Sequence, residues 1–246
     1  MEKWQNKIAV VTGASSGIGE AIVKDLASHG LKVVGLARRV EKIPTCDGKV
    51  TAIKCDVANL DSIKSAFKEI EEKFGKINIL INNAGVGIYV KVLEEGEEIT
   101  RKLNEVIDIN FKGLVHSTRE AAKLMKNSNE NGIIINIGSV FDSNIAFPNP
   151  SSLYPATKYA VRAFTEIVRQ EFVISECDKI KVCNISPGIV KTNIGHAGGR
   201  KNADNHYDAV PHLVAEDISQ SVLYVLSTPE NVNVTQITIK PVGEKF

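Results

Sequence analysis

Few features of disulfide-bonded, metal-binding or membrane proteins occur in this 246-residue sequence. The four cysteines, Cys46, Cys55, Cys177 and Cys183, form no CxxC pair and have no histidine at ligand spacing, which favours reduced core thiols. No segment approaches the roughly 18 consecutive apolar residues of a membrane span, and the apolar run near the N-terminus is too short for a secretory signal. We therefore expect a cytoplasmic protein without a metal ion.

Strong charge of either sign is also lacking, since the formal net charge is +1 at pH 7. Such a chain has no overall field that would attract nucleic acid or an anionic membrane, so we expect a small-molecule partner. Neither a low-complexity linker nor a repeat of solenoid period divides the sequence. We interpret residues 1–246 as one domain.

The sequence does contain a regular alternation of apolar runs and amphipathic segments. The strand-like runs are KIAVV, LKVVGL, VTAIKC, INILIN, GIIINIG, IKVCNIS and TQITIK. Segments with apolar residues three and four apart, such as 21–29 and 63–74, lie between them and predict helices. This pattern predicts an α/β fold of the Rossmann type, a doubly wound, seven-stranded parallel sheet with helices on both faces.

Two longer segments interrupt the alternation, 141–152 after the fifth run and a polar, glycine-bearing loop over about 187–212 after the sixth. Open α/β sheets bind ligands at the carboxyl ends of their strands, so both segments are candidates for substrate contact. The long loop contains His196, His206 and His212, which lack metal-ligand spacing. Their roles stay open between surface residues and substrate contacts.

The stretch TGASSGIG follows the first apolar run and places three glycines at the start of a helix. Gly13 permits a tight turn, Gly17 lets the backbone approach a ligand, and Gly19 lets the helix pack closely on the sheet. The exposed N–H groups of a helix N-terminus favour a pyrophosphate. The spacing differs from G-x-G-x-x-G, so by itself the stretch could also be a strand-to-helix turn and nothing more.

When the later motifs are added, the chain resembles the short-chain dehydrogenase/reductase family over nearly its whole length. The resemblance is to the single-domain branch of about 250 residues. The matching motifs are TGxxxGIG, the NNAG at 82–85, Asn110, Ser139, the YxxxK of Tyr154 and Lys158, Pro187-Gly188 and Thr192. Segments such as VVGLARRVE and SPGIVKT are similar to those of farnesol dehydrogenase-like members and of related carbonyl or ketosteroid reductases. The resemblance implies hydride transfer with a nicotinamide cofactor.

Tyr154 and Lys158 are four residues apart, so in a helix they share one face. A neighbouring ammonium favours the phenolate, and we therefore expect Lys158 to lower the pKa of Tyr154 toward a useful range. Ser139 ends a strand, where its hydroxyl can donate to the substrate oxygen. The spacing from Ser139 to Tyr154 is longer than in many relatives, and Ser143 is the alternative serine.

The resemblance assigns two further groups of residues. It implies that Asn110 kinks its helix and supports a water that relays protons toward Lys158, which completes the catalytic set Asn110, Ser139, Tyr154 and Lys158. It also implies that Lys158 holds the nicotinamide ribose. Asn82 has either a place in the cofactor groove or a purely structural role.

The end of the second strand indicates which cofactor is used. NAD sites of this type commonly carry an acidic residue there, whereas this chain has Ala37 followed by Arg38 and Arg39. Without a carboxylate and with a guanidinium, the site favours a 2′-phosphate and hence NADP(H). The residues expected at the cofactor are Gly13, Ser15, Ser16, Gly17, Ile18, Arg38, Arg39, Asp56, Val57, Asn83, Ala84, Gly85, Tyr154, Lys158, Pro187, Gly188, Val190 and Thr192.

The candidate substrate residues are mostly apolar and include no cationic clamp for a carboxylate, which favours an apolar alcohol or carbonyl compound. The site residues are Ser139, Phe141, Ile145, Tyr154 and Ile194, with Phe147, Ile189, Val190 and Leu213 as further candidates. Several of these apolar side chains could instead close the core. An isoprenoid alcohol such as farnesol is our first choice and a steroid or other ketone the second. The alternatives from other classes are an NADP-binding sensor without turnover and a nucleotide-using transferase. By resemblance, the chain forms a homodimer or homotetramer.

Overall fold

Seven parallel strands form one sheet at the centre of the computed structural model, which describes residues 1–145, 152–194, 207 and 209–245. The strand order is β3-β2-β1-β4-β5-β6-β7. The strands are β1 (Ile8–Thr12), β2 (Lys32–Ala37), β3 (Val50–Lys54), β4 (Ile79–Asn82), β5 (Gly132–Ile137), β6 (Ile180–Pro187) and β7 (Gln236–Ile239). The predicted fold class is confirmed.

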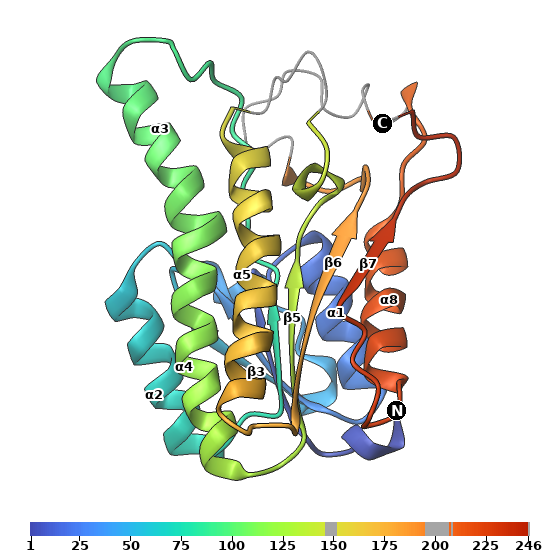
Figure 1. Ribbon diagram of the computed structural model, residues 1–246. Coiled ribbons are helices and arrows are strands. Elements are labelled where there is room, and N and C mark those ends of the chain that lie inside the picture. Colours follow the sequence, from blue (N-terminus) through green and yellow to red (C-terminus); the bar gives the residue numbers. More distant parts are fainter. Residues whose placement is uncertain (146–151, 195–206, 208, 246) are drawn as a thin grey trace.

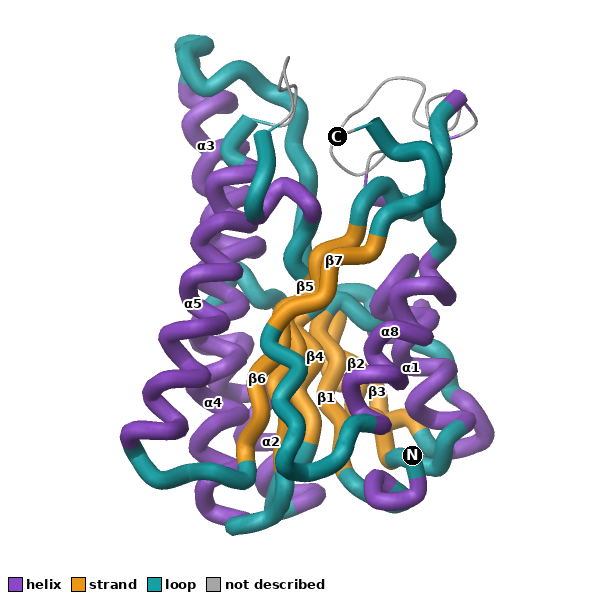
Figure 2. The backbone as a smooth tube through the Cα atoms, turned by 45° about the vertical axis from the view of Figure 1, so that its right-hand side comes forward, coloured by secondary structure: helices purple, strands orange, loops and turns teal. Residues whose placement is uncertain are grey.

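Helices cover both faces of this sheet (Figure 1). The helices are α1 (Gly17–Ser28), α2 (Leu60–Phe74), α3 (Glu97–Ile107), α4 (Gly113–Ser128), α5 (Tyr154–Ile174) and α8 (Ala215–Ser227). Helices α1 and α8 pack together on one face, and α2, α4 and α5 cover the other, with the strands between the two layers (Figure 2). No helix in the described part of the chain has the length and hydropathy needed to cross a membrane.

Alternation along each strand divides the core into these two layers. Ala9 and Val11 of β1 pack with α1 and α8, whereas Ile8 and Val10 pack with α2 and α4. Strands β2 and β3 continue to one side of β1, and β4 to β7 continue to the other. The order therefore reverses between β1 and β4, which opens a crevice at the carboxyl ends of these strands.

A row of amide side chains crosses the sheet near this end. Asn82, Asn136, Asn184 and Gln236 stand opposite one another in register on β4, β5, β6 and β7. The Asn82 Nδ2 donates to Asn136 Oδ1 at 2.9 Å, and the Asn136 Nδ2 donates to Thr165 Oγ1 of α5 at 2.9 Å. The first three amides are at most 3% exposed, so a buried polar layer separates the apolar core from the crevice.

Helix α3 runs into α4 through a π-helical turn at Asp108–Lys112, which contains Asn110. Extra residues in one helical turn redirect the side chains within it, and such turns are frequent at functional sites. The helix is thus distorted at Asn110, as expected, and the distortion is a π-turn. Two helices begin a few residues earlier than the sequence predicted. Helix α1 begins at Gly17, inside the glycine motif, and α2 begins at Leu60, where Asn59 caps it.

Candidate active site

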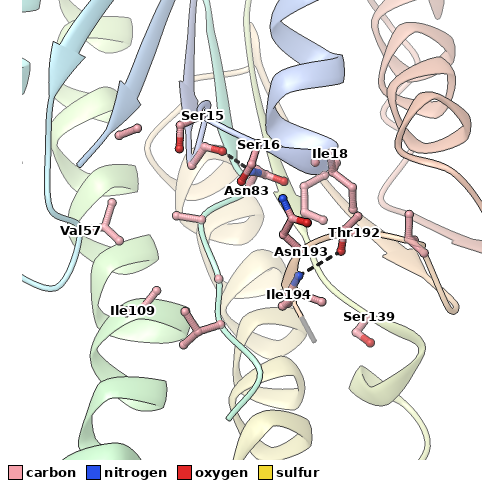
Figure 3. A pocket seen from close by; sticks show the side chains of 18 of the residues that line it. Ser15, Ser16, Ile18, Val57, Asn83, Ile109, Ser139, Thr192, Asn193 and Ile194 are labelled. Carbon is pink, nitrogen blue, oxygen red and sulfur yellow. Dashed lines mark hydrogen bonds between the residues drawn. The ribbon is translucent and has the colours of Figure 1, made fainter. Parts of the chain in front are cut away.

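The crevice holds a cavity of about 500 Å³ between the N-terminus of α1 and the start of α5. Every residue expected at the cofactor lies in its wall, from Gly13 to Thr192. In Figure 3, Ser15, Ser16 and Ile18 lie at one end of the cavity and Ser139 at the other, with Thr192 and Ile194 between them. Groups from β1, β2, β5, α5 and the segment after β6 are thereby brought to one site.

The glycine turn after β1 is held by the strand next to it. Thr12 Oγ1 accepts from the backbone N–H groups of Asn83 and Ala84 at 3.0 and 3.1 Å, and Asn83 Nδ2 donates to the Thr12 carbonyl at 3.0 Å. Gly13 has a φ of 68°, and a Cβ there would stand 2.9 Å from the Cα of Ala84. The NNAG motif therefore supports the turn, with Asn83 to Gly85 in the cavity wall and Asn82 in the buried amide row.

The first turn of α1 faces this cavity with unsatisfied donors. Ser16 occupies the N-cap position without a side-chain hydrogen bond to the helix, and Gly17 follows with a φ of 56°. The first N–H groups of a helix have no partner within it, and the helix dipole adds partial positive charge there. This end of the cavity thus fits a phosphate or pyrophosphate group.

Gly19 lies one turn into α1, and a Cβ at this position would overlap the carbonyl oxygen of Gly13. We expect Gly19→Ala to push the turn out of place, to lower the free energy of unfolding by about 1–3 kcal/mol and to weaken cofactor binding. Chemical denaturation and cofactor titration measure the two effects. As a control, Gly75→Ala strains a φ of 70° at an open position beyond α2, so it should lower stability without changing cofactor affinity. Equal cofactor affinity in both variants would contradict the packing role of Gly19.

Strand β2 ends at buried Ala37, and the exposed side chains of Arg38 and Arg39 follow it in the cavity wall. In the described part of the chain, neither guanidinium forms an ion pair with an acidic side chain. The nearby acidic residue in the wall is Asp56, whose Oδ1 accepts from the backbone N–H of Ala58 at 3.1 Å. This end of the cavity therefore offers positive charge to an anionic group.

At the opposite end, Ser139, Tyr154 and Lys158 meet around one point. Ser139 follows β5 and hydrogen-bonds Tyr154, the first residue of α5. One turn further on, Lys158 is 5% exposed and its Nζ donates to the Ile137 carbonyl at 2.7 Å. The same Nζ lies 5.5 Å from the centroid of the Tyr154 ring. The predicted shared face of Tyr154 and Lys158 is thus present in the structure.

Burial governs the protonation of this pair. Removal from water raises the pKa of the Tyr154 phenol to about 12, opposed by the hydrogen bond from Ser139. Burial also lowers the pKa of Lys158 to about 8, opposed by the carboxylate of Asp142. The predicted lowering of the Tyr154 pKa is therefore wrong in direction, because burial raises this pKa and the group that lowers it is Ser139.

Asn110 lies behind the cavity wall and is 1% exposed. Its Oδ1 accepts from the backbone N–H of Val86 at 2.7 Å, and its Nδ2 donates to the Val86 carbonyl at 2.9 Å and to Thr157 Oγ1 at 3.2 Å. A Cβ on Gly85 would stand 3.4 Å from Asn110 Oδ1 and 3.9 Å from Lys158 Nζ, so both atoms border the space next to Gly85. Asn110 joins the loop after β4 to the helix that carries Tyr154.

The structure distinguishes the two candidate serines. Ser139 lies in the cavity wall, whereas Ser143 is exposed and its hydroxyl donates to the Val140 carbonyl at 3.4 Å. Among the substrate candidates, Ile194 lines the cavity and Phe141 packs edge-on against Tyr154 with centroids 6.4 Å apart. Ile145 is 56% exposed and the structure does not bring it to the cavity.

Other candidates lie around or outside this site. Leu213 pairs with Val190 in a short parallel bridge, and the backbone N–H of Ile189 donates to Glu244 Oε1 at 3.0 Å. Phe147, His196, His206 and half of the loop 187–212 lie outside the described residues. The described residues contain no cluster of three potential metal ligands. His212 packs near Tyr207, and its Nδ1 lies 3.1 Å from the Val210 carbonyl oxygen.

Some wall residues were missed by the sequence analysis: Leu36, Cys55, Val86, Ile109, Ile137, Gly138 and Asn193. Most of them are next to a predicted residue in the chain, so extending each predicted segment by one residue would have included them. Ile109 adjoins the predicted Asn110, but the sequence does not show that it faces the cavity, because it lies in a π-helical turn that helical periodicity does not predict. Cys55, expected as a core thiol, is 2% exposed and also forms part of the wall.

Comparisons with known proteins agree with this architecture. The family model described as short chain dehydrogenase matches residues 7–203. Over the full length of both chains, the protein is 43% identical to a farnesol dehydrogenase of Aedes aegypti. The closed form of a serine dehydrogenase complexed with NADP+ is 29% identical, with 97% of this chain and 96% of that chain covered and a TM-score of 0.85.

A short chain dehydrogenase/reductase from Burkholderia phymatum in complex with NAD is 25% identical, with 97% of this chain and 90% of that chain covered and a TM-score of 0.81. The family match spans most of the sequence and the relative from Aedes aegypti spans all of it. The sequence, the sheet order and the cavity lead to one conclusion: this chain belongs to the short chain dehydrogenase family of oxidoreductases.

Proposed function

We propose that this oxidoreductase uses NADP(H) to interconvert an apolar alcohol and its carbonyl compound, and that its substrate is an isoprenoid alcohol such as farnesol. The observation that carries the proposal is a single cavity whose wall contains Ser139, Tyr154 and Lys158 together with the glycine turn and Arg38. A proton donor and an anion-binding helix terminus in one cavity suit a carbonyl substrate beside a dinucleotide.

The described residues fit a phosphorylated dinucleotide. The free donors of the α1 N-terminus would hold the pyrophosphate, and Asp56 and Val57 would lie at the adenine edge. Arg38 and Arg39, with no acidic residue at the end of β2, would hold the 2′-phosphate. The neighbouring structure with NADP+ supports this choice, and the one with NAD is the contrary case.

When bound, the nicotinamide would supply or accept the hydride, and the chain's own residues would handle the proton. With its pKa near 12, the Tyr154 phenol is protonated at neutral pH and can give its proton to a carbonyl oxygen. The Ser139 hydroxyl can donate a hydrogen bond to the same oxygen as charge develops on it. Lys158 would hold the ribose, as the family resemblance implies, and Asn110 would keep the loop after β4 against α5.

The substrate class follows from the character of the wall near Tyr154. Ile194 and Phe141 supply apolar surface there, and among the described wall residues at this end the cationic side chain is the buried Lys158. Such a wall suits an apolar chain better than a carboxylate. The name of the relative from Aedes aegypti supports farnesol in particular. A steroid or other ketone is the second candidate, because the same apolar wall would accept it.

A cofactor-binding sensor is the alternative of a different class. The enclosed hydrogen bond between Ser139 and Tyr154 and the burial of Lys158 favour turnover, since binding alone requires none of these arrangements. A nucleotide-using transferase would likewise have no use for the tyrosine and lysine pair.

The test is a substrate screen with NADP+ and NADPH over terpenoid alcohols, aldehydes and steroid ketones, followed by absorbance of the reduced nicotinamide. We expect the highest kcat/KM for an isoprenoid alcohol or its aldehyde. A higher kcat/KM for a steroid ketone would make steroid ketones the preferred substrate class in place of isoprenoid alcohols. Cofactor binding without any turnover would establish the sensor instead.

We also propose that residues 1–246 act as one domain and assemble as a homodimer or homotetramer in the cytoplasm. On α5, the side chains of Tyr159 and Ile167 are 39% and 52% exposed and lie on one face, eight residues apart. Exposed apolar side chains in a row on a long helix support its burial in a subunit interface, as the family resemblance implies.

A further inference from the structure

The turn that carries Ser139 contains a buried carboxylate that the proposed mechanism does not use. Asp142 ends the 3-10 helix Val140–Asp142 directly after β5, and its backbone N–H donates to the Ser139 carbonyl at 2.8 Å. Its side chain is 0% exposed. A carboxylate is seldom buried without a full set of partners, because desolvation of the charge is costly.

The partners of Asp142 lie on the next strand of the sheet. Its Oδ2 accepts from Asn184 Nδ2 at 2.7 Å and from the hydroxyl of Ser186, both on β6. Gln236 of β7 donates in turn to Ser186 Oγ at 3.2 Å. Ser186 immediately precedes Pro187 and Gly188, which line the cavity. Asp142 therefore connects the Ser139 turn with the cavity segment at the end of β6.

The charge of Asp142 is only partly compensated. In the described part of the chain, its Oδ1 has no hydrogen-bond partner, and the guanidinium Nη1 of Arg162 is 4.0 Å away. The Arg162 side chain is 47% exposed, so water screens its contribution. A buried charge without a close counter-ion acts on titratable groups at longer range than a solvated one.

The groups within reach of this field are Tyr154 and Lys158. After burial, which is the larger influence on both, the Asp142 carboxylate raises the pKa of each of them. The other titratable or charged groups around it are Arg162 on α5, Tyr89 after β4, and Tyr207. The side chains that β6 and β7 present to Asp142 and its network are the neutral Asn184, Ser186 and Gln236.

We propose that Asp142 is a positioning residue that ties the Ser139 turn to β6 and supplies a fixed negative charge to the Tyr154 and Lys158 pair. The inference rests on the proposed function in so far as Tyr154 moves the proton. The charge holds Lys158 in its ammonium form and disfavours the Tyr154 phenolate. It thereby biases the pair toward proton donation, which is the direction of carbonyl reduction.

The test is Asp142→Asn, which keeps the shape of the side chain and one acceptor oxygen for Asn184 and Ser186 and removes its charge. Loss of the negative charge lowers the pKa of Tyr154, so the phenolate needed for alcohol oxidation forms at lower pH. The rising limb of kcat/KM for oxidation should move down by about one pH unit, the size expected for one nearby charge. The matched control is Asp178→Asn, an exposed carboxylate just before β6 at the amino ends of the strands, which should leave the profile in place.

A second variant gives the opposite sign. Arg162→Gln removes the nearest cation, so the limb should move to higher pH, by less than Asp142→Asn moves it down because water screens the exposed guanidinium. Arg162 is exposed, so this variant keeps the proposal testable even where Asp142→Asn fails to fold. A purely structural role would give lower stability or turnover in either variant with the pH profile unmoved, and that result would overturn the proposal.

A readout without turnover separates this inference from the proposed function. The ¹³Cε signal of Lys158, assigned by its loss in Lys158→Met, reports protonation of the amine directly. Starting from a pKa of about 8, the midpoint should fall in Asp142→Asn and rise in Arg162→Gln. If the substrate screen found no turnover, the proposed function would fail while this titration still decided the role of Asp142. Unchanged midpoints in both variants would refute it.

Discussion

Replacement of Tyr154 with phenylalanine is expected to lower turnover by roughly 100-fold to 10,000-fold, the range that a positioned general acid or base contributes. The substituted ring would keep the edge-on contact with Phe141, so the shape of the wall is retained. Only the hydroxyl that hydrogen-bonds Ser139 is removed. Cofactor affinity, measured by fluorescence titration of NADPH, should therefore stay within a few-fold of the parent enzyme.

The serine pair supplies the control for this prediction. Ser139→Ala should also reduce kcat strongly, since it removes a donor aimed at the substrate oxygen. Ser143→Ala removes an exposed hydroxyl that bonds the Val140 carbonyl and should change kcat very little. Near-parental turnover of the Tyr154 variant would take Tyr154 out of the mechanism. An exchange of outcomes between the two serines would mean that the longer loop moves the active hydroxyl to Ser143.

The second large effect is expected at the end of β2. If Arg38 pairs with a 2′-phosphate, Arg38→Ala removes a charge-assisted contact worth about 1.5–3 kcal/mol, or roughly 10-fold to 150-fold in NADPH affinity. NADH has no such phosphate, so its affinity should hardly change. Adding Ala37→Asp should repel the phosphate, offer a carboxylate to the ribose hydroxyls and move the preference toward NADH.

The measurement is kcat/KM for both reduced cofactors in the parent, Arg38→Ala and the double variant at one salt concentration, because exposed charges are screened. A parent enzyme that prefers NADH would refute the NADP(H) assignment. Equal loss of both cofactors in Arg38→Ala would show that the arginine is a surface charge with no phosphate partner.

Sequence periodicity was sufficient for the architecture because the inner strands β1, β4, β5 and β6 are buried on both faces. Runs such as GIIINIG have no other stable environment than the centre of a covered parallel sheet. The glycine turn and the YxxxK pair were equally accessible, since each depends on residues close together in the chain. All the residues predicted at the cofactor consequently fall in one cavity wall.

What the sequence could not provide is the environment of those residues. The helical spacing of Tyr154 and Lys158 correctly predicts their shared face, but it contains no information on how deeply α5 buries them. Desolvation reverses the expected direction of the Tyr154 pKa for that reason. Asp142 was similarly inconspicuous in the sequence, because its partners Asn184 and Ser186 lie more than 40 residues away.

The amide row across β4 to β7 has a consequence for how this sheet reaches a single arrangement. Strands made almost wholly of isoleucine and valine can slide past one another with little loss of apolar contact, so their pairing is weakly specified. A slip of one residue at Asn136 would turn its amide into the apolar layer beneath α1 and α8, away from Asn82 and Thr165. The four amides thus penalise misaligned sheets, and the chain gains folding fidelity where its hydrophobic pattern alone would leave competing alignments close in energy.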